Sequence, residues 1–569
     1  MSFLGVDLSL TGRRWVGPSL EVEGASQMLE QQTALPGPLC RVLAQRGIAP
    51  EHAEAFLTPS LRNLLPDPRG LKDMERAAAR FLAALDARQR IAVFADYDVD
   101  GGSSAALLLV WLRKMGHSAT LYVPDRIDEG YGPNEAAMEA LAKTHDLILC
   151  VDCGTLSHGP IAAAGGTDVI VLDHHLGSET LPPAYAVVNP NRQDESGDLH
   201  YLCAAAVVFL MLVEAGRQLR GQDRAAPDLI ALLDLVALAT VADVAPLVGV
   251  NRAFVRQGLT VMARRDRVGV TALADIAGLD TAPTSYHLGY VLGPRVNAGG
   301  RIGAADLGAR LLSTADPHEA EALAARLDAL NIERREIEAA VRASALAQAE
   351  TRGLGSALVW ASGPNWHPGV VGIVAARLKE TARRPSIVIG VENGIGKGSG
   401  RSIPGIDLGQ PIQRLVREGL LLKGGGHKMA AGLTVEEAKI DAAMARLTEL
   451  LEKQGAHASG ITDLRVDGLL MPEAAQIELV DMIEQAGPFG AAAPAPRFVF
   501  SDMAIRFAKR VGESHLKISF GDASGSLEAI CFGAYDSEIG GTLEAHGGAR
   551  FHLAGKLEIN NWRGRRSVQ

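Results

Sequence analysis

The stretch IAVFADYDVDGGSSAALLLVWLRKMG, residues 91–116, decides the fold of this chain. It begins with a run of apolar residues typical of a buried strand, turns on acidic residues and glycines, and continues as an apolar helix pattern. LILCVDCG (147–154) and VIVLDHH (169–175) repeat the first half of this arrangement. Strands that alternate with helices form a mostly parallel sheet, which binds its ligands at the carboxyl ends of the strands. We therefore expect an α/β domain with these polar residues at one edge of its sheet: Asp96, Asp98, Asp152, His174 and His175.

These side chains are candidate ligands of divalent metal ions. Asp96 and Asp98 stand two residues apart, so both carboxylates can face one point as the chain turns. Hard cations prefer oxygen ligands, and Mn²⁺ also accepts imidazole. Acidic turns are also common without a metal, and adjacent histidines can serve a surface turn and a helix cap. Because Asp152 follows an equivalent strand, a site for two metals accounts better for the set, and Asp243 either completes it or simply caps a helix.

Composition narrows the class of protein. A chain of 569 residues is long enough for two to four domains, and a net charge of −10 excludes generic binding to nucleic acid over the whole surface. Five cysteines do not make a disulfide scaffold, which favours the reducing cytoplasm. The first residues lack the pattern of a signal peptide, and the longest apolar stretch, residues 204–213, is too short to span a membrane.

Further periodic patterns predict the domain organisation. Residues 316–350 contain no Gly or Pro after the first turn and predict one helix of about 50 Å, at ~1.5 Å per residue. The last strand-like segment is still incomplete at Gln569, which indicates that the chain stops within an element. The predicted organisation is a helical lead-in (1–75), an α/β domain (76–315), a connecting helix (316–350), a second α/β domain (351–457) and a small β-barrel (458–569).

The second α/β domain is locally basic. Residues 377–428 contain ten Lys or Arg against four acidic residues, which suits phosphate binding but also fits a solvated helix face. Two glycine-rich loops, 398–402 and 424–428, expose backbone N–H groups beside Arg401, His427 and Lys428.

The motifs taken together resemble a known family. DYDVDG (96–101), VDCG (151–154), DHH (173–175) and ATVADVAPL (239–247) resemble, in this order, the four motifs of the DHH phosphoesterase superfamily. From about residue 60 to the end the chain resembles RecJ, the bacterial exonucleases specific for single-stranded DNA. Four further motifs carry this second resemblance: LGPRVNAGGRIG (292–303), NWHPGVVGIVAARL (365–378), GSGRSIPG (398–405) and GGGHKMAAG (424–432).

The resemblance implies a set of metal ligands and catalytic residues. It implies that two Mg²⁺ or Mn²⁺ ions are held by Asp96, Asp98, Asp152, His174 and Asp243. Asp152 would bridge the ions, and His175 would contact the scissile phosphate. Asp173 would orient the histidines, as carboxylates behind metal ligands often do. The implied catalytic residues are Asp98, Asp152, His175 and Arg301.

The resemblance also implies how DNA binds. Arg126, Ser399 and Arg401 would hold the terminal 5′ phosphate and so give 5′→3′ polarity, while Asn297 and Arg301 would hold phosphate near the cleaved bond. Either Arg126 or Arg301 can instead form an ion pair with a neighbouring acid. His427 and Lys428 would contribute further contacts, and the β-rich tail would be an oligonucleotide-binding (OB) fold that holds single strands. The expected role is DNA repair and recombination, as a monomer beside a helicase and a single-strand-binding protein.

Three other functions compete with this one. A phosphodiesterase for short oligonucleotides or cyclic dinucleotides would not need residues 460–569. An inactive DNA-binding scaffold would not need all four motifs, and an inorganic pyrophosphatase would not need a long basic cleft.

Overall fold

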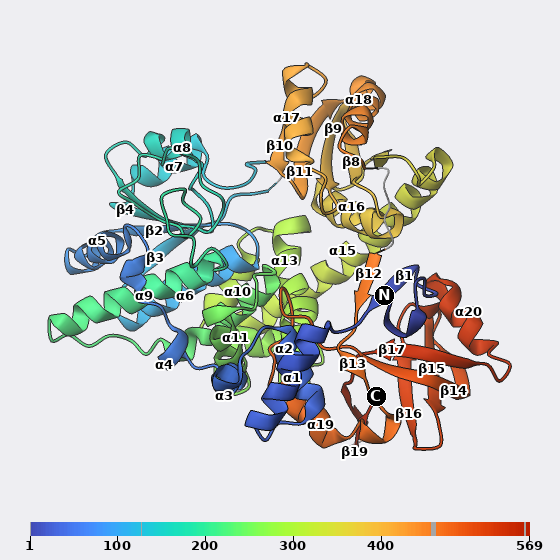
Figure 1. The fold of residues 1–569 in the computed structure, drawn as a ribbon. Helices are drawn as coiled ribbons and strands as arrows, with labels where there is room; N and C mark the ends of the chain where they lie inside the picture. Colours follow the sequence, from blue (N-terminus) through green and yellow to red (C-terminus); the bar gives the residue numbers. More distant parts are fainter. Residues whose placement is uncertain (1, 127, 457–461, 563–564) are drawn as a thin grey trace. The chain divides into compact units, whose positions relative to one another are not determined.

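The computed structural model describes residues 2–126, 128–456, 462–562 and 565–569. The chain forms two compact units (Figure 1): Pro66–Ala245 with Gln257–Ser459, and Met1–Leu65 with Pro246–Arg256 and Gly460–Gln569. Within the described ranges, no helix is both long and apolar enough to cross a membrane.

The larger unit begins with a parallel sheet of five strands, in the order β3-β2-β4-β5-β6. The strands are β2 (Ile91–Ala95), β3 (Ala119–Tyr122), β4 (Leu147–Val151), β5 (Asp168–Leu172) and β6 (Ala186–Val188). The helices around it are α5 (Met74–Asp86), α6 (Val99–Lys114), α7 (Glu135–Ala142), α8 (His158–Ala163), α9 (Ala204–Gly221) and α10 (Leu233–Ala242). Helices α7 and α8 pack on one face of the sheet, and α6 and α9 lie on the other (Figure 1). The predicted parallel-sheet domain is therefore confirmed.

The strand order places a topological switch between β2 and β4. The chain goes from β2 outward to β3 in one direction and then returns to β4 on the other side of β2. Connections on the two sides of such a switch leave the sheet in opposite directions, which opens a crevice at the carboxyl ends of the two strands. Asp96 and Asp152 are the first residues after β2 and β4, so the fold places both of them in this crevice.

A group of helices follows the sheet in sequence. These are α11 (Gly249–Met262), α12 (Val268–Ile276), the π-helix η5 (His287–Leu292), α13 (Gly293–Ile302), α14 (Leu307–Ser313) and α15 (Pro317–Arg352). The predicted long helix is confirmed as α15, which Asp316 caps by accepting a hydrogen bond from the backbone N–H of His318. It ends before Gly353, whose positive φ of 96° is readily adopted only by glycine.

The second α/β domain is built on a mixed sheet in the order β10-β11-β9-β8-β7, in which only β7 and β8 are parallel. Its strands are β7 (Val359–Pro364), β8 (Ser386–Glu392), β9 (Ile395–Arg401), β10 (Lys423–His427) and β11 (Ala430–Glu436). Its helices are α16 (Pro368–Ala382), α17 (Gly409–Arg417) and α18 (Ile440–Glu452).

The smaller unit joins the two ends of the chain. Its helices are α1 (Leu20–Gln32), α2 (Gly37–Gln45), α3 (Ala53–Leu57), α4 (Leu61–Leu64), α19 (Ile477–Glu484) and α20 (Glu538–Glu544). Its strands are β1 (Arg13–Val16), β12 (Thr462–Arg465), β13 (Gly468–Leu469), β14 (Phe498–Val511), β15 (His515–Gly521), β16 (Ser526–Cys531), β17 (Arg550–Gly555), β18 (Ile559–Trp562) and β19 (Arg565–Val568).

The amino-terminal segment differs from the helical lead-in that the sequence predicted. It contains β1, which pairs in parallel with β12, 449 residues away. Leu39 and Leu43 of α2 share one buried core with Phe498 and Phe500 of β14. Both ends of the chain therefore fold as one body, because neither can bury its apolar face alone.

Candidate active site

Three aspartates follow three neighbouring strands of the parallel sheet. The backbone N–H of Asp96 donates to Val151 (3.3 Å), that of Asp152 to Leu172 (3.0 Å) and that of Asp173 to Val188 (3.1 Å). Each aspartate is thus fixed by the last carbonyl of the next strand, and each is almost completely buried. The sheet itself brings these carboxylates to one edge.

The turn after β2 contributes two more carboxylates. Asp98 caps α6, since its Oδ1 accepts hydrogen bonds from the N–H groups of Asp100 (2.8 Å) and Gly101 (3.1 Å). Asp100 is fully buried and caps α9 by accepting from Ala204 (2.7 Å) and Ala205 (2.8 Å). Sequence reasoning did not single out Asp100, although its place in the DYDVDG motif was the available signal. With both oxygens engaged, Asp100 holds α9 against the cluster.

His174 stands at the centre of the cluster. Its Nε2 lies 3.3 Å from Asp152 Oδ1, 3.7 Å from Asp100 Oδ2 and 3.8 Å from Asp243 Oδ2. Asp243 is the C-cap residue of α10, and its side chain reaches His174 from the carboxyl end of that helix. The structure therefore brings together all five residues that the resemblance implied as metal ligands: Asp96, Asp98, Asp152, His174 and Asp243.

The cluster fits divalent cations. Three overlapping triads have ligand atoms within 4.8 Å of one another: Asp96–Asp98–Asp152, Asp152–His174–His175 and Asp100–His174–Asp243. Oδ1 of Asp96 and Oδ1 of Asp152 are buried and accept no hydrogen bond from any described residue. A buried carboxylate oxygen without a donor is costly, and bound cations remove that cost. The donor set of oxygens with one or two imidazoles is that expected for Mg²⁺ or Mn²⁺.

Electrostatics support the same conclusion. Burial raises the pKa of Asp152 and of Asp96 well above the ordinary value, and neighbouring carboxylates raise both further. Burial, with Asp100 and Asp98, raises the pKa of Asp243 to about 8. The carboxylates repel one another in the absence of positive charge, so the site attracts cations.

Asp173 and His175 form a pair beside the cluster. Asp173 Oδ1 accepts from the N–H of His174 (2.8 Å), the N–H of His175 (3.2 Å) and Nδ1 of His175 (2.8 Å). Burial alone would raise the pKa of Asp173, but hydrogen bonds from His175 and Thr155 hold it well below its usual value. Burial likewise opposes the imidazolium, yet Asp173 raises the pKa of His175 to about 9. Asp173 therefore favours the protonated form of His175, whose Nδ1 lies 3.1 Å from the hydroxyl of Tyr131.

Two asparagines that the sequence reasoning missed shape the DHH turn. Nδ2 of Asn189, which is fully buried, donates to the backbone carbonyl of His175 (2.7 Å), and Nδ2 of Asn191 donates to that of His174. Both follow β6 in the sequence VVNPN. A pair of asparagines just after a buried strand was the signal that could have identified them.

The guanidinium groups of Arg126, Arg301 and Arg401 form a basic group, called the guanidinium group below. The Arg126 guanidinium lies 5.2 Å from the ring centre of Tyr97, and burial together with Arg126 lowers the pKa of Arg301 to about 10. Burial and then Arg126 also lower the pKa of Arg401. These three predicted substrate-binding arginines are therefore close enough to repel one another, which is the property of an anion site.

The amino-terminal part of α16 lies beside Arg301 and Arg401. Arg301 donates to the carbonyl of Gly369 (3.1 Å), and Arg401 donates to Ser399 Oγ (2.9 Å). A Cβ on Gly372 would lie 3.1 Å from both Arg401 Nη2 and Ser399 Oγ, so glycine permits the close approach of α16. The partial positive charge at a helix N-terminus adds to that of the arginines.

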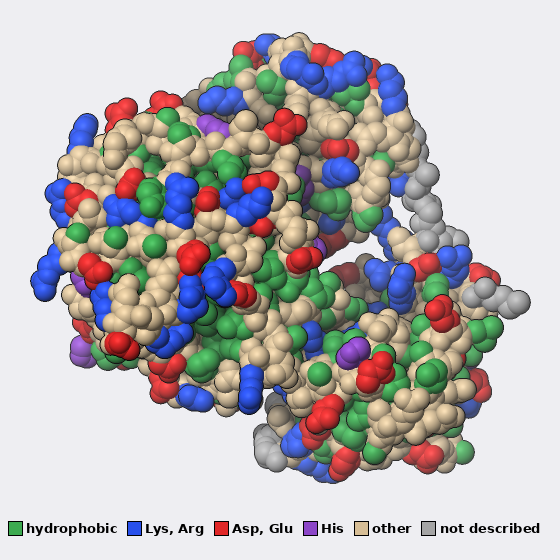
Figure 2. Space-filling model, turned by 60° about the vertical axis from the view of Figure 1, so that its left-hand side comes forward, with side chains coloured by type: hydrophobic (Ala, Val, Ile, Leu, Met, Phe, Trp, Pro, Cys, Tyr) green, Lys and Arg blue, Asp and Glu red, His purple; other side chains and the backbone are tan. Residues whose placement is uncertain are grey.

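Asn297, His427 and Lys428 are the remaining predicted site residues, and only Asn297 contacts a residue next to a metal ligand among the contacts described. Asn297 Oδ1 accepts a hydrogen bond from the N–H of Val99, directly after Asp98 (3.0 Å). His427 and Lys428 lie at the turn between β10 and β11 and are exposed. Within the described part of the chain, no hydrogen bond or ion pair joins either side chain to Ser399 or Arg401. Over much of the face shown in Figure 2, basic and acidic side chains are interspersed, so attraction for phosphate has to arise locally.

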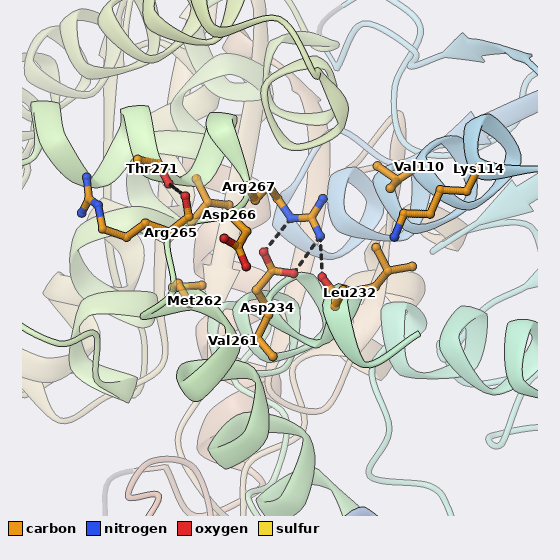
Figure 3. Close-up of a pocket in the computed structure, with 12 residues that line it drawn as sticks. Val110, Lys114, Leu232, Asp234, Val261, Met262, Arg265, Asp266, Arg267 and Thr271 are labelled. Atoms are coloured by element: carbon orange, nitrogen blue, oxygen red, sulfur yellow. Dashed lines mark hydrogen bonds and ion pairs between the residues drawn. The ribbon is translucent and has the colours of Figure 1, made fainter. Parts of the chain in front are cut away.

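A separate pocket lies at the far end of α6 (Figure 3). Asp98 caps the amino end of this helix, whereas Val110 and Lys114 near its carboxyl end line the pocket. Across it Arg267 donates to both carboxylate oxygens of Asp234, at 2.6 and 2.9 Å. This ion pair satisfies the buried charge of Asp234, unlike the unpaired oxygens of Asp96 and Asp152 in the cluster.

Comparison with protein families gives the class of protein that this fold and site define. Residues 90–240 match the DHH family, N-terminal domain; residues 353–453 match the DHHA1 domain; residues 466–569 match the RecJ OB domain. The parallel sheet with its acidic edge is thus a DHH domain, the mixed sheet is a DHHA1 domain, and the β-rich part is an OB domain. The predicted fold class is confirmed in each part.

Individual relatives specify the family. The chain is 39% identical to the single-stranded-DNA-specific exonuclease RecJ of Dickeya dadantii over 95% of this chain and 96% of that protein. The corresponding Escherichia coli protein is 37% identical over 94% of this chain and 95% of its own length. A crystal structure of Thermus thermophilus RecJ in complex with Mn²⁺ matches 98% of this chain and 78% of that one, with 29% identity and a TM-score of 0.81. The chain belongs to the RecJ family.

Proposed function

We propose that this protein is a metal-dependent exonuclease that hydrolyses single-stranded DNA to mononucleotides from the 5′ end. One observation carries the proposal. A cluster of carboxylates and imidazoles that fits divalent cations includes Asp96 and Asp98, and the Arg126 guanidinium lies 5.2 Å from the ring centre of Tyr97, the residue between them. The relatives named above are single-stranded-DNA-specific exonucleases, which supports DNA as the substrate.

The cluster suits phosphodiester hydrolysis. Asp96, Asp98, Asp152, His174 and Asp243 hold two Mg²⁺ or Mn²⁺ ions in this proposal, with Asp152 shared between them. Two bound divalent cations lower the pKa of a bound water and neutralise the charge that develops on the phosphate. His175, protonated through its hydrogen bond to Asp173, donates a hydrogen bond to the scissile phosphate. Asn297 already accepts from Val99 through Oδ1, so its Nδ2 is left to donate to a phosphate oxygen.

The guanidinium group suits a terminal phosphate. A 5′ phosphate carries more negative charge than an internal phosphodiester, and Arg126, Arg401, Ser399 and the amino end of α16 supply several donors in one place. Arg301 is close enough to both groups for Arg126 to lower its pKa and Asp98 to raise it. The terminal phosphate and the adjacent phosphodiester are therefore held together, which explains removal of one nucleotide at a time.

The other parts of the chain support the use of long single strands. The OB domain is a fold that binds single strands through basic grooves and base stacking. His427 and Lys428 add exposed positive or donor groups to the DHHA1 domain. A role in DNA repair and recombination follows, with the chain acting as a cytoplasmic monomer beside a helicase and a single-strand-binding protein.

Digestion of end-labelled DNA tests this function. The protein is incubated with Mn²⁺ or Mg²⁺ and with oligonucleotides that carry a label at the 5′ or the 3′ end, single-stranded or in a duplex. We expect 5′-labelled mononucleotides from the single strand at the earliest times, and no digestion with EDTA. Release of 3′-terminal nucleotides first, or equal rates on the duplex, would contradict the proposal.

A further inference from the structure

An exposed pair of tyrosines lies at the start of the π-helix η5: Tyr286 directly precedes it and Tyr290 is within it. The side chains of Tyr286 and Tyr290 are 63% and 73% exposed, and their rings stack with centroids 5.2 Å apart and planes inclined at 24°. They stand four residues apart on consecutive turns, so they present one continuous aromatic surface. Large exposed aromatic surfaces on a soluble protein commonly mark a binding site.

The helix η5 packs against the end of α10 that leads into the acidic cluster. A Cβ on Gly289 would lie 3.3 Å from Val241 Cγ1, and one on Gly293 would lie 3.2 Å from Ala242 Cβ. The two glycines therefore hold η5 and the start of α13 against the last residues of α10, which precede Asp243 directly. Tyr290 directly follows Gly289, so its backbone lies close to the end of α10 that precedes Asp243.

The same helical stretch continues toward the guanidinium group. The helix η5 runs directly into α13, which carries Asn297 and Arg301. Asn297 contacts the start of α6 next to Asp98, and Arg301 contacts Gly369 at the start of α16. One continuous helical stretch therefore links the guanidinium group, the start of α6 beside the metal ligands, and the tyrosines.

We propose that Tyr286 and Tyr290 form a stacking platform for the bases on the 3′ side of the cleaved bond. This inference rests on the proposed function, because the position of the 5′ phosphate sets the direction of the strand. Tyr290 and Tyr286 lie three and seven residues before Gly293, which packs against Ala242, the residue before Asp243. In this proposal the platform receives bases a few nucleotides from the cleaved bond, the second to fourth of the substrate.

The platform favours unpaired DNA. A base in a duplex is stacked on both faces and paired at its edge, whereas a base in a single strand offers a free face to an aromatic ring. Stacking also does not depend on which base is present, as expected for an enzyme that digests any sequence. Val244, which follows Asp243, adds an exposed apolar side chain next to the cluster.

A length series tests the platform in the full-length protein with Mn²⁺. The double variant Tyr286→Ala/Tyr290→Ala is compared with the unchanged protein on 5′-phosphorylated oligothymidylates of two and eight nucleotides. We expect the ratio of kcat/KM for the octamer to that for the dimer to fall at least tenfold, mainly through KM. Tyr286→Phe/Tyr290→Phe retains the rings and keeps the original ratio. Tyr185→Ala is the matched control, because Tyr185 precedes β6 at the opposite, amino-terminal edge of the sheet.

Abasic substrates locate the contact. In the unchanged protein, octamers with one abasic site at the second, third or fourth nucleotide should bind more weakly than octamers with the site at the seventh. In the double alanine variant that difference should disappear. An unchanged octamer-to-dimer ratio would overturn the platform, as would an equal loss for both lengths. If the double alanine variant changed the oligomeric state and nothing else, the platform would also be overturned, because the tyrosines would then bind a second copy of this chain. If the unchanged protein does not digest single strands from the 5′ end, the proposed function fails instead.

Discussion

Nε2 of His174 lies 3.3 Å from Oδ1 of Asp152, although the two residues follow different strands of the sheet, β5 and β4. Ligand atoms about 2.1 Å from one octahedral cation lie roughly 3 Å apart, so this pair is already at the separation of two ligands of a single ion. Oδ1 of Asp152 accepts no hydrogen bond from any described residue and is therefore free to be a ligand. Parallel neighbouring strands that end in register create this relationship.

Replacing Asp152 by Asn should abolish metal-dependent hydrolysis of single-stranded DNA. The neutral amide cannot bridge two cations, and the stabilisation of the fold by Mn²⁺ should shrink with it. In the metal-free protein the same change should raise the melting temperature, because it removes a buried carboxylate whose Oδ1 accepts no hydrogen bond from any described residue. Calorimetry with and without Mn²⁺ measures both effects, and full activity in this variant would refute the metal assignment.

Stability without metal should fall as the pH rises from about 4 to 8. Burial and then Asp100 raise the pKa of Asp243 from its ordinary value of 3.8 to about 8, so the folded state binds more protons than the unfolded state in this window. Mn²⁺ binds only the deprotonated ligands, so its stabilising effect should be larger at pH 8 than at pH 6. Melting curves in EDTA and in Mn²⁺ at pH 6 and pH 8 measure this effect. An equal Mn²⁺-induced rise in melting temperature at both pH values would contradict the prediction.

Replacing Asp173 by Asn should lower kcat by about 10- to 100-fold with a smaller change in KM. The Asn side chain keeps the size of Asp173 but loses the charge that holds His175 protonated. Asp173→Glu should not restore the activity, because the longer chain cannot reach both backbone N–H groups and Nδ1. Steady-state kinetics on an octamer decides this, with retained Mn²⁺-dependent stabilisation as evidence that the cluster is intact. A loss confined to KM would show a role in binding only.

Arg126→Ala and Arg401→Ala should each weaken recognition of the 5′ phosphate. Loss of a partner in a partly buried charged hydrogen bond costs about 2 kcal/mol, which corresponds to a roughly 30-fold rise in KM. The rise should be seen with 5′-phosphorylated substrates and should be smaller with 5′-hydroxyl substrates. Arg414→Ala is the control in the same domain, because Arg414 forms an exposed ion pair with Glu418. An equal effect of Arg414→Ala would indicate general electrostatics instead of a pocket.

Leu43→Ala should destabilise the carboxyl-terminal β-rich part, although Leu43 lies near the amino terminus. Leu43 is fully buried in the core that contains Phe498 and Phe500, and such a truncation costs about 2–5 kcal/mol. Limited proteolysis should then cut within residues 460–569 faster than in the unchanged protein. Leu20→Ala, at a position that is 93% exposed in α1, should leave the rate unchanged. Equal proteolysis of both variants would contradict the shared core.

The sequence by itself determined the elements and their chemistry. Apolar runs ending in Asp or His identified β2, β4 and β5 with their functional residues, since a buried strand needs apolar residues and its end can be polar. The absence of Gly and Pro fixed α15. The order of the motifs indicated the DHH and RecJ families, and the comparisons confirmed this.

The tertiary structure decided which residues meet. Local patterns do not encode contacts between distant segments, so the sequence could not reveal that Asp100 caps α9 or that Asn189 holds the carbonyl of His175. It also predicted a separate amino-terminal lead-in, whereas β1 and α2 complete the unit formed by the carboxyl-terminal residues. The sequence also did not reveal that the rings of Tyr286 and Tyr290 stack on a helix that packs against α10. The physical reason is the same in each case: burial and hydrogen bonding between distant segments are properties of the folded chain.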